Sequence, residues 1–145
     1  MKTICLSLDF ELRWGMRHLL KDDFYKYSVN IKGARDVVPK IIECFDKYKV
    51  ESTWALVGGL MLRDWKEFKD VVSDVDIGFI PFSGEMRKEF EDLYFAPDLV
   101  QLLKKTHGVE IASHTFSHLF PLEPAVTPDH FENDTRLFTI YVGRN

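Results

Sequence analysis

Two short apolar segments flank an amphipathic one within the first 60 residues, and this order constrains the fold more than any other feature. Residues 3–10 (TICLSLDF) and 52–58 (STWALVG) are too short for helices and are bounded by polar residues or glycine, so each is predicted to be a buried strand. From Gly33 to Tyr48, apolar side chains recur at steps of three and four residues, as on one face of a helix. A strand, a helix and a second strand form the βαβ unit of a parallel sheet.

The rest of the chain extends this pattern to the order β-α-β-(insertion)-α-β-α. Residues 60–95 are interpreted as an insertion packed over one end of the sheet. Pro97 favours the start of a helix that ends before Gly108, and residues 109–112 (VEIA) are predicted to be a third strand. Thr127 followed by proline is typical of the start of a last helix. The sequence therefore predicts an α/β fold with residues 1–145 as a single domain.

Composition excludes several classes of function. The 145 residues are 46% hydrophobic and 29% charged, as in ordinary globular proteins, and the net charge of −4 provides no basic surface for nucleic acid or an anionic membrane. The longest apolar run, residues 54–62, is shorter than the roughly 20 residues of a membrane span, and the first residues lack the pattern of a signal peptide. We therefore expect a cytoplasmic protein. Cys5 and Cys44 are too few for a disulfide framework and are predicted to be small buried side chains.

Side chains suited to a metal site gather after the first and third predicted strands. Asp9 and Glu11 lie two residues apart, so both project from one face of an extended chain. His114 and His118 lie four residues apart, so both imidazoles share a face if this segment forms a helical turn. The carboxyl ends of parallel strands meet at one edge of a sheet, where catalytic groups collect. Two neutral imidazoles and one carboxylate form a ligand set of catalytic zinc and non-haem iron sites.

Each pair also has a simpler explanation. An Asp-x-Glu pair is commonly a solvated strand end, and a His-x-x-x-His spacing often arises by chance. His107, near a predicted helix end, is interpreted as a surface residue favoured by the helix dipole. The combination favours a metal site, because burying four such groups without a cation is costly. The carboxylate that does not bind the metal can then act as a general base toward water.

Three motifs carry a resemblance to a known family. Residues 7–11 (SLDFE), 52–55 (STWA) and 110–118 (EIASHTFSH) together resemble successive motifs of the polysaccharide deacetylases, carbohydrate esterase family 4 with its NodB homology domain. The resemblance runs from the N-terminus to about Asp134. It implies a (β/α) barrel of the distorted seven-stranded deacetylase type and metal-dependent hydrolysis of N- or O-acetyl groups on a carbohydrate.

The resemblance also implies roles for single residues. Asp9 corresponds to the catalytic base, and His114 and His118 correspond to ligands of a divalent metal, expected to be zinc. The common family pattern has a third ligand, an aspartate, directly after the base. Phe10 occupies that position here, so Glu11 is assigned as the ligand in its place.

The segment that follows points to a substrate. Residues 13–15 (RWG) resemble the branch of the family found near O-antigen and surface-polysaccharide genes. The resemblance implies a surface sugar as substrate, with Arg13 and Trp14 as residues that bind it.

The C-terminal segment departs from the family. Members continue through an Arg-Pro motif and a late histidine that acts as general acid, and residues 137–145 (LFTIYVGRN) no longer resemble the next family helix. We therefore expect a partial barrel truncated after about three strands, with an open edge that favours self-association. Two alternatives stay open: a deacetylase acting on a carbohydrate, or a metal-binding remnant or interaction fragment without turnover.

Overall fold

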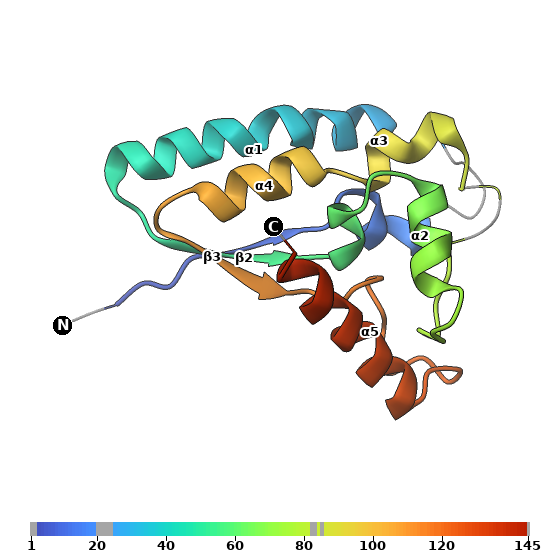
Figure 1. Ribbon diagram of the computed structural model, residues 1–145. Coiled ribbons are helices and arrows are strands. Elements are labelled where there is room, and N and C mark those ends of the chain that lie inside the picture. Colours follow the sequence, from blue (N-terminus) through green and yellow to red (C-terminus); the bar gives the residue numbers. More distant parts are fainter. Residues whose placement is uncertain (1–2, 20–24, 82–83, 85, 145) are drawn as a thin grey trace.

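The computed structural model describes residues 3–19, 25–81, 84 and 86–144, which form a three-stranded parallel sheet flanked by helices (Figure 1). The strands lie in the order β1-β2-β3. The elements are β1 (Ser7–Phe10), the 3-10 helix η1 (Leu12–Leu19), α1 (Ser28–Tyr48), β2 (Ser52–Leu56), η2 (Gly58–Met61), α2 (Trp65–Val72), η3 (Lys88–Phe90), α3 (Glu91–Tyr94), α4 (Pro97–Lys105), β3 (Val109–Ser113) and α5 (Pro128–Val142). The predicted parallel α/β order is confirmed, and within the described residues the sheet is open, with no closed barrel.

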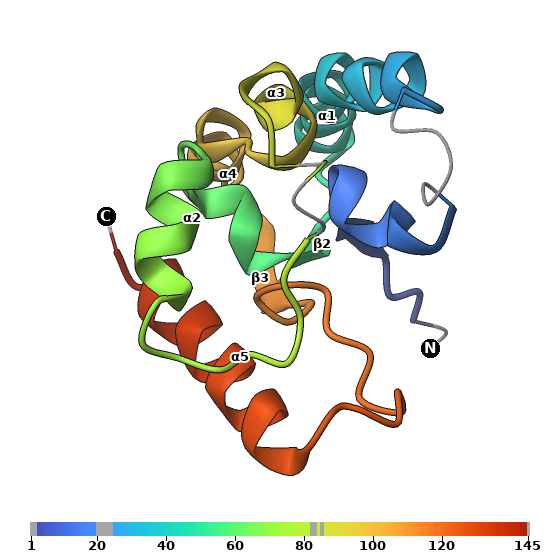
Figure 2. The same ribbon diagram turned by 90° about the vertical axis from the view of Figure 1, so that its right-hand side faces the viewer.

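The register of the strands gives the sheet two different faces. Phe10 pairs with Leu56, and both are buried on the face that α1 and α4 cover (Figures 1 and 2). One step back along the strands, Asp9, Ala55 and Ala112 form a row on the opposite face. Side chains alternate between the faces of a strand, so Asp9 points away from the helical layer. The open face therefore carries small and polar side chains.

Proline and capping residues mark the starts of α4 and α5 where the sequence predicted them. Helix α4 begins at Pro97, as predicted, and α5 begins after Thr127, whose hydroxyl accepts a hydrogen bond from the backbone N–H of His130 at 3.3 Å. Helix α1 begins at Ser28, earlier than the periodic pattern from Gly33 predicted. Helix α5 continues to Val142, so the segment that lost its resemblance to the family is helical over most of its length. No helix in the described part of the chain is long and apolar enough to cross a membrane.

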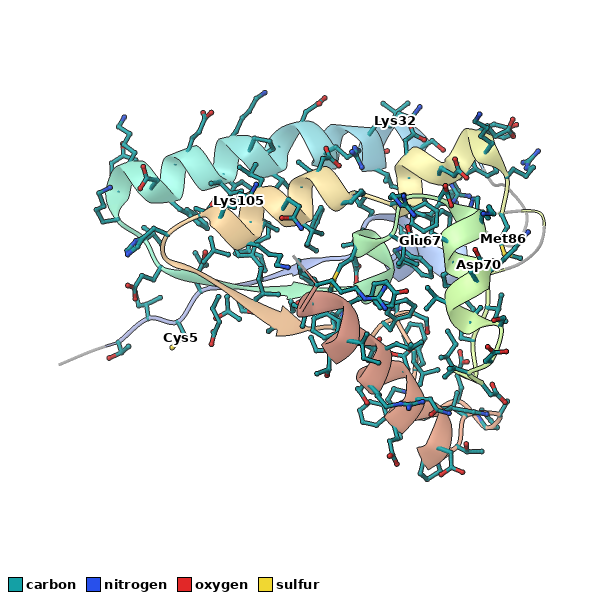
Figure 3. All side chains as sticks on the ribbon, in the orientation of Figure 1. Cys5, Lys32, Glu67, Asp70, Met86 and Lys105 are labelled. Atoms are coloured by element: carbon teal, nitrogen blue, oxygen red, sulfur yellow. The ribbon has the colours of Figure 1, made fainter. Side chains whose placement is uncertain are left out.

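The prediction that both cysteines are buried is wrong. Strand β1 begins at Ser7 rather than residue 3, and the segment before it runs away from the sheet, with Ile4 93% exposed and Cys5 exposed (Figure 3). Cys44 is exposed on α1. It follows the buried Ile42 by two positions, which is about 200° around a helix, so it faces away from the core.

An aromatic cluster fills the space at the carboxyl ends of the strands. Trp14 of η1 packs against Phe68 of α2 and Tyr94 of α3, with ring centroids 5.5 Å and 5.2 Å away. Its indole N–H donates a hydrogen bond to the carbonyl of Tyr94 at 2.8 Å. Gly59 lies directly against the ring, since a Cβ there would be 2.3 Å from Trp14 Cζ2. This cluster fixes the course of the chain directly after β1.

Candidate metal centre

Glu11, His114 and His118 meet at the carboxyl ends of β1 and β3. The Nε2 atoms of His118 and His114 lie 2.8 Å and 3.2 Å from the same oxygen, Oε2 of Glu11. One ligating atom from each of the three residues lies within 4.8 Å of the other two. All three side chains are partly buried, and His118 is the most enclosed at 12% side-chain exposure. The sequence prediction that these three residues come together is therefore confirmed.

The position of Glu11 depends on the turn that follows it. Leu12 adopts a left-handed backbone with φ of 46°, and the N–H of Trp14 donates to the carbonyl of Glu11 at 3.0 Å. Gly15 then passes against the carboxylate, because a Cβ at Gly15 would lie 2.0 Å from Glu11 Oε1. Any larger residue at position 15 would displace the carboxylate, so Gly15 is part of the site. The sequence offered one signal for it, a glycine four residues after the acid.

The two histidines lie on an irregular loop, which corrects the expectation of a helical turn. Thr115 and His118 have positive φ values of 63° and 57°, a conformation uncommon outside glycine. The loop is aligned by the neighbouring strand β2, because the N–H of His114 donates to the carbonyl of Leu56 at 2.8 Å. The N–H of Gly58 donates to the carbonyl of Thr115 at 2.9 Å. Tertiary hydrogen bonds, rather than helical periodicity, place the two imidazoles together.

A buried carboxylate on α5 accepts hydrogen bonds from the loop that carries the two histidines. Asp134 accepts hydrogen bonds from the backbone N–H groups of Phe116 and Ser117 and from the Ser117 hydroxyl. Burial raises the pKa of Asp134, and the bonds from Ser117 and Phe116 oppose that rise. Sequence reasoning missed this residue. Its signal was an acid three and four positions before Leu137 and Phe138, on the apolar stripe of α5.

The donor set fits a divalent cation. The hydrogen bond from His118 lowers the pKa of Glu11 below its ordinary value near 4.5, against the opposing effect of burial, so the carboxylate is anionic at neutral pH. Two ligands of a tetrahedral zinc, each about 2.0–2.1 Å from the ion, lie roughly 3.3 Å apart. The observed separations of 2.8 Å and 3.2 Å are close to that spacing. The residues can hold a metal without a large rearrangement, and the set leaves coordination positions open for substrate and water.

Three other predicted site residues lie apart from this centre. Asp9 is exposed on the open face of β1, two residues before Glu11, and is not one of the three clustered donors. Arg13 is 0% exposed, with its guanidinium stacked over Phe90 at 4.9 Å. Trp14 is 1% exposed within the aromatic cluster. Both side chains are therefore covered in this structure, and the binding of a sugar by Arg13 and Trp14 stays an expectation.

Two other histidines, His130 and His107, lie outside this centre. His130 caps α5: its Nδ1 accepts from the N–H of Thr127 at 3.1 Å, and its Nε2 lies 3.1 Å from Asp76 Oδ2. His107 is exposed before β3, at the far end of that strand from the metal centre. A hollow of about 550 Å³ also lies at this far end, against residues 3–7, 51–53 and 108–110. The candidate centre, with its three partly buried side chains, lies at the opposite end of the sheet from this hollow.

Comparison with known proteins identifies the family. The family model for the polysaccharide deacetylases matches residues 19–136. The match contains both histidines of the centre and Asp134, and it begins after Asp9 and Glu11. Neither the curated proteins nor the solved structures contain a match to the chain. Because the matched residues make up most of the 145-residue chain, this protein belongs to the polysaccharide deacetylase family.

Proposed function

We propose that the protein is a metal-dependent deacetylase that hydrolyses N- or O-acetyl groups on a carbohydrate, with a surface polysaccharide as its substrate class. The observation that carries the proposal is the convergence of Glu11, His114 and His118 on one point at the strand ends. Membership of the deacetylase family implies the carbohydrate. Zinc is the proposed ion, because two imidazoles and a carboxylate with open positions are a ligand set of catalytic zinc.

The proposed mechanism divides the work between two carboxylates. Glu11, His114 and His118 would hold a divalent ion, which when bound would supply Lewis acidity to polarise an acetyl carbonyl and acidify water. Asp9 acts as general base and takes the proton from the water that attacks the acetyl carbon. Its position supports this role: Asp9 is exposed two residues before Glu11, and the small side chain of its partner Ala55 leaves space next to it on this face of the sheet. Bond cleavage then releases acetate and a sugar amine or hydroxyl.

We also propose that the three parallel strands form part of a (β/α) barrel, with Asp9 on its inner face. The support is the arrangement of layers. All three strands are parallel and in sequential order, and α1 and α4 cover one face only (Figure 2). The other face carries Asp9 and two alanines in one row. These side chains are polar or small, so they leave space for a substrate next to Asp9.

One observation favours a second candidate, a metal-binding protein without turnover. Release of a sugar amine requires a general acid, typically worth about 10²–10⁴-fold. Neither His130 nor His107 is placed to supply one: His130 is bonded to Asp76, and His107 lies at the opposite end of β3. Metal binding without acetate release is the signature of this candidate.

The metal centre is tested by titrating chelator-stripped protein with zinc. We expect one site per chain, lost in His114→Ala and in His118→Ala. His107→Ala is the matched control and should bind as the unsubstituted chain does. Affinity should also fall below about pH 6, because protonated imidazoles cannot ligate. Unchanged stoichiometry in both centre variants would show that these histidines are not the ligands.

Acetate release separates the two candidates. The protein is incubated with zinc and acetylated chitooligosaccharides or acetylated surface sugars, and free acetate is measured. Release that disappears in His114→Ala establishes deacetylation. Zinc binding with no detectable acetate favours the candidate without turnover, and failure to bind zinc overturns both.

A further inference from the structure

Asp134 is fully buried, yet it is not one of the three clustered metal donors. It lies on α5 at 0% exposure, beside Leu137 and Phe138 on the face that packs into the core. A carboxylate in such a position is costly unless donors surround it. Within the described residues, three donors bond to its carboxylate, and all three come from two consecutive residues, Phe116 and Ser117. These residues form the middle of the loop that joins His114 to His118.

The two halves of this loop are held by different parts of the fold. The half next to β3 is tied to β2 and η2, through the N–H of His114 to Leu56 and the N–H of Gly59 to the carbonyl of Phe116 at 2.8 Å. The half that leads to His118 has other support. Asp134 Oδ2 accepts from the Ser117 N–H at 3.0 Å and from the Ser117 hydroxyl at 2.6 Å.

The backbone of this second half needs external support. His118 has a φ of 57°, which an L-residue adopts only when its surroundings compensate for the strain. Its neighbour Ser117 is fully buried and bonded to Asp134 through both its N–H and its hydroxyl. A bond network at Ser117 therefore fixes the direction in which the next residue, His118, projects its imidazole toward Glu11.

We infer that Asp134 is a positioning residue for the metal centre: by accepting the donors of Phe116 and Ser117, it holds His118 in ligating geometry without touching the ion. The inference rests on the proposed function, since it requires that His114 and His118 bind a metal. Loss of Asp134 affects His118 more than His114, because His114 keeps its backbone bond to β2.

The decisive variant is Asp134→Asn, which preserves size and shape. The N–H groups of Phe116 and Ser117 bond to different oxygens of Asp134, and asparagine replaces one of these oxygens by a donating amide, so one of the two bonds is lost. Glu132→Gln is the matched control, because it makes the same change from carboxylate to amide on the exposed side of α5. Ser117→Ala is a milder second variant that removes only the hydroxyl donor.

We expect zinc affinity to fall about 10–100-fold in Asp134→Asn, the range usual for residues that orient metal ligands, and to be unchanged in Glu132→Gln. Ser117→Ala should show a smaller loss in the same direction, and Asp134→Glu should recover part of the affinity. The visible absorption spectrum of the Co²⁺-loaded protein reports ligand geometry. It should shift in Asp134→Asn and stay constant in Glu132→Gln. A purely structural role would lower the unfolding midpoint of the metal-free protein without changing the Co²⁺ spectrum of the folded fraction.

Two failures are distinguishable. If the unsubstituted chain binds no zinc, the proposed function fails and this inference fails with it. If the unsubstituted chain binds zinc and folded Asp134→Asn binds it equally well with the same Co²⁺ spectrum, only the positioning role is overturned. Should Asp134→Asn not fold, an unchanged zinc affinity and Co²⁺ spectrum in Ser117→Ala overturn the inference.

Discussion

Two acidic residues two positions apart occupy different environments at the strand end. Glu11 lies within hydrogen-bond distance of both imidazoles, and His118 lowers the pKa of its carboxyl group. Asp9 is exposed on the open face of β1 and is not one of the clustered donors. This separation supports one ligand and one base, rather than two carboxylates that share an ion.

Substitution separates these two roles. Glu11→Gln should weaken zinc binding by about tenfold or more, because a neutral amide replaces an anionic ligand. Asp9→Asn should keep the zinc affinity, and wherever acetate release is measurable it should reduce that release by about 10²–10⁴-fold. Calorimetric zinc titration and acetate release measure the two effects. If Asp9→Asn loses zinc while Glu11→Gln retains it, the roles are reversed.

At the scale of elements, the segments that follow the strands determine the site. Trp14 anchors η1 in the aromatic cluster, which places Glu11 just before it. Gly58 and Gly59 at the start of η2 bond to the histidine loop and leave room for Phe116 and Trp14. The strands bring the candidate metal donors to one edge of the sheet, and these tightly packed connections set the positions of their side chains.

Two glycines give a matched test of that packing. Gly59→Ala should lower the free energy of unfolding by about 1–3 kcal/mol, because the new Cβ would lie 2.3 Å from the Trp14 ring. Gly33→Ala, inside α1, has nothing within 4 Å of its new Cβ and should raise that free energy by up to about 1 kcal/mol. Urea unfolding of both variants measures the difference. Equal effects would mean that η2 does not pack on Trp14 as described.

At the scale of the whole molecule, the sheet has two open edges within the described residues. The order β1-β2-β3 leaves the outer edges of β1 and β3 without a neighbouring strand. Unpaired strand edges can pair with another chain. The apolar side chains of Ile4 and Leu6, just before β1, are exposed near one of these edges.

We therefore predict that the protein self-associates through its open sheet. Light scattering after size-exclusion chromatography should give a mass above the 17.0 kDa of one chain, falling toward that value on dilution. Unpaired strand edges associate through backbone hydrogen bonds and apolar side chains rather than charges, so moderate salt should change the mass little. A constant monomer mass at all concentrations would contradict the prediction.

The sequence alone determined several of the elements and grouped the three candidate metal donors. Strand β2, the start of α4 at Pro97 and the start of α5 after Thr127 follow from local periodicity and capping chemistry, which a few neighbouring residues specify. Glu11 and the two histidines could be grouped because the carboxyl ends of parallel strands lie at one edge.

Only the tertiary structure decided which side chains are covered and how the loop between the histidines is held. Trp14 is buried because α2 and α3 pack over it, whereas Cys5 is exposed in the segment before β1. The buried hydrogen bonds of Asp134 join segments that are 17 and 18 residues apart in the chain. They hold the residue before His118, whose backbone is left-handed. Burial and such bonds depend on which distant segment packs alongside, and local sequence preference carries no information about that partner.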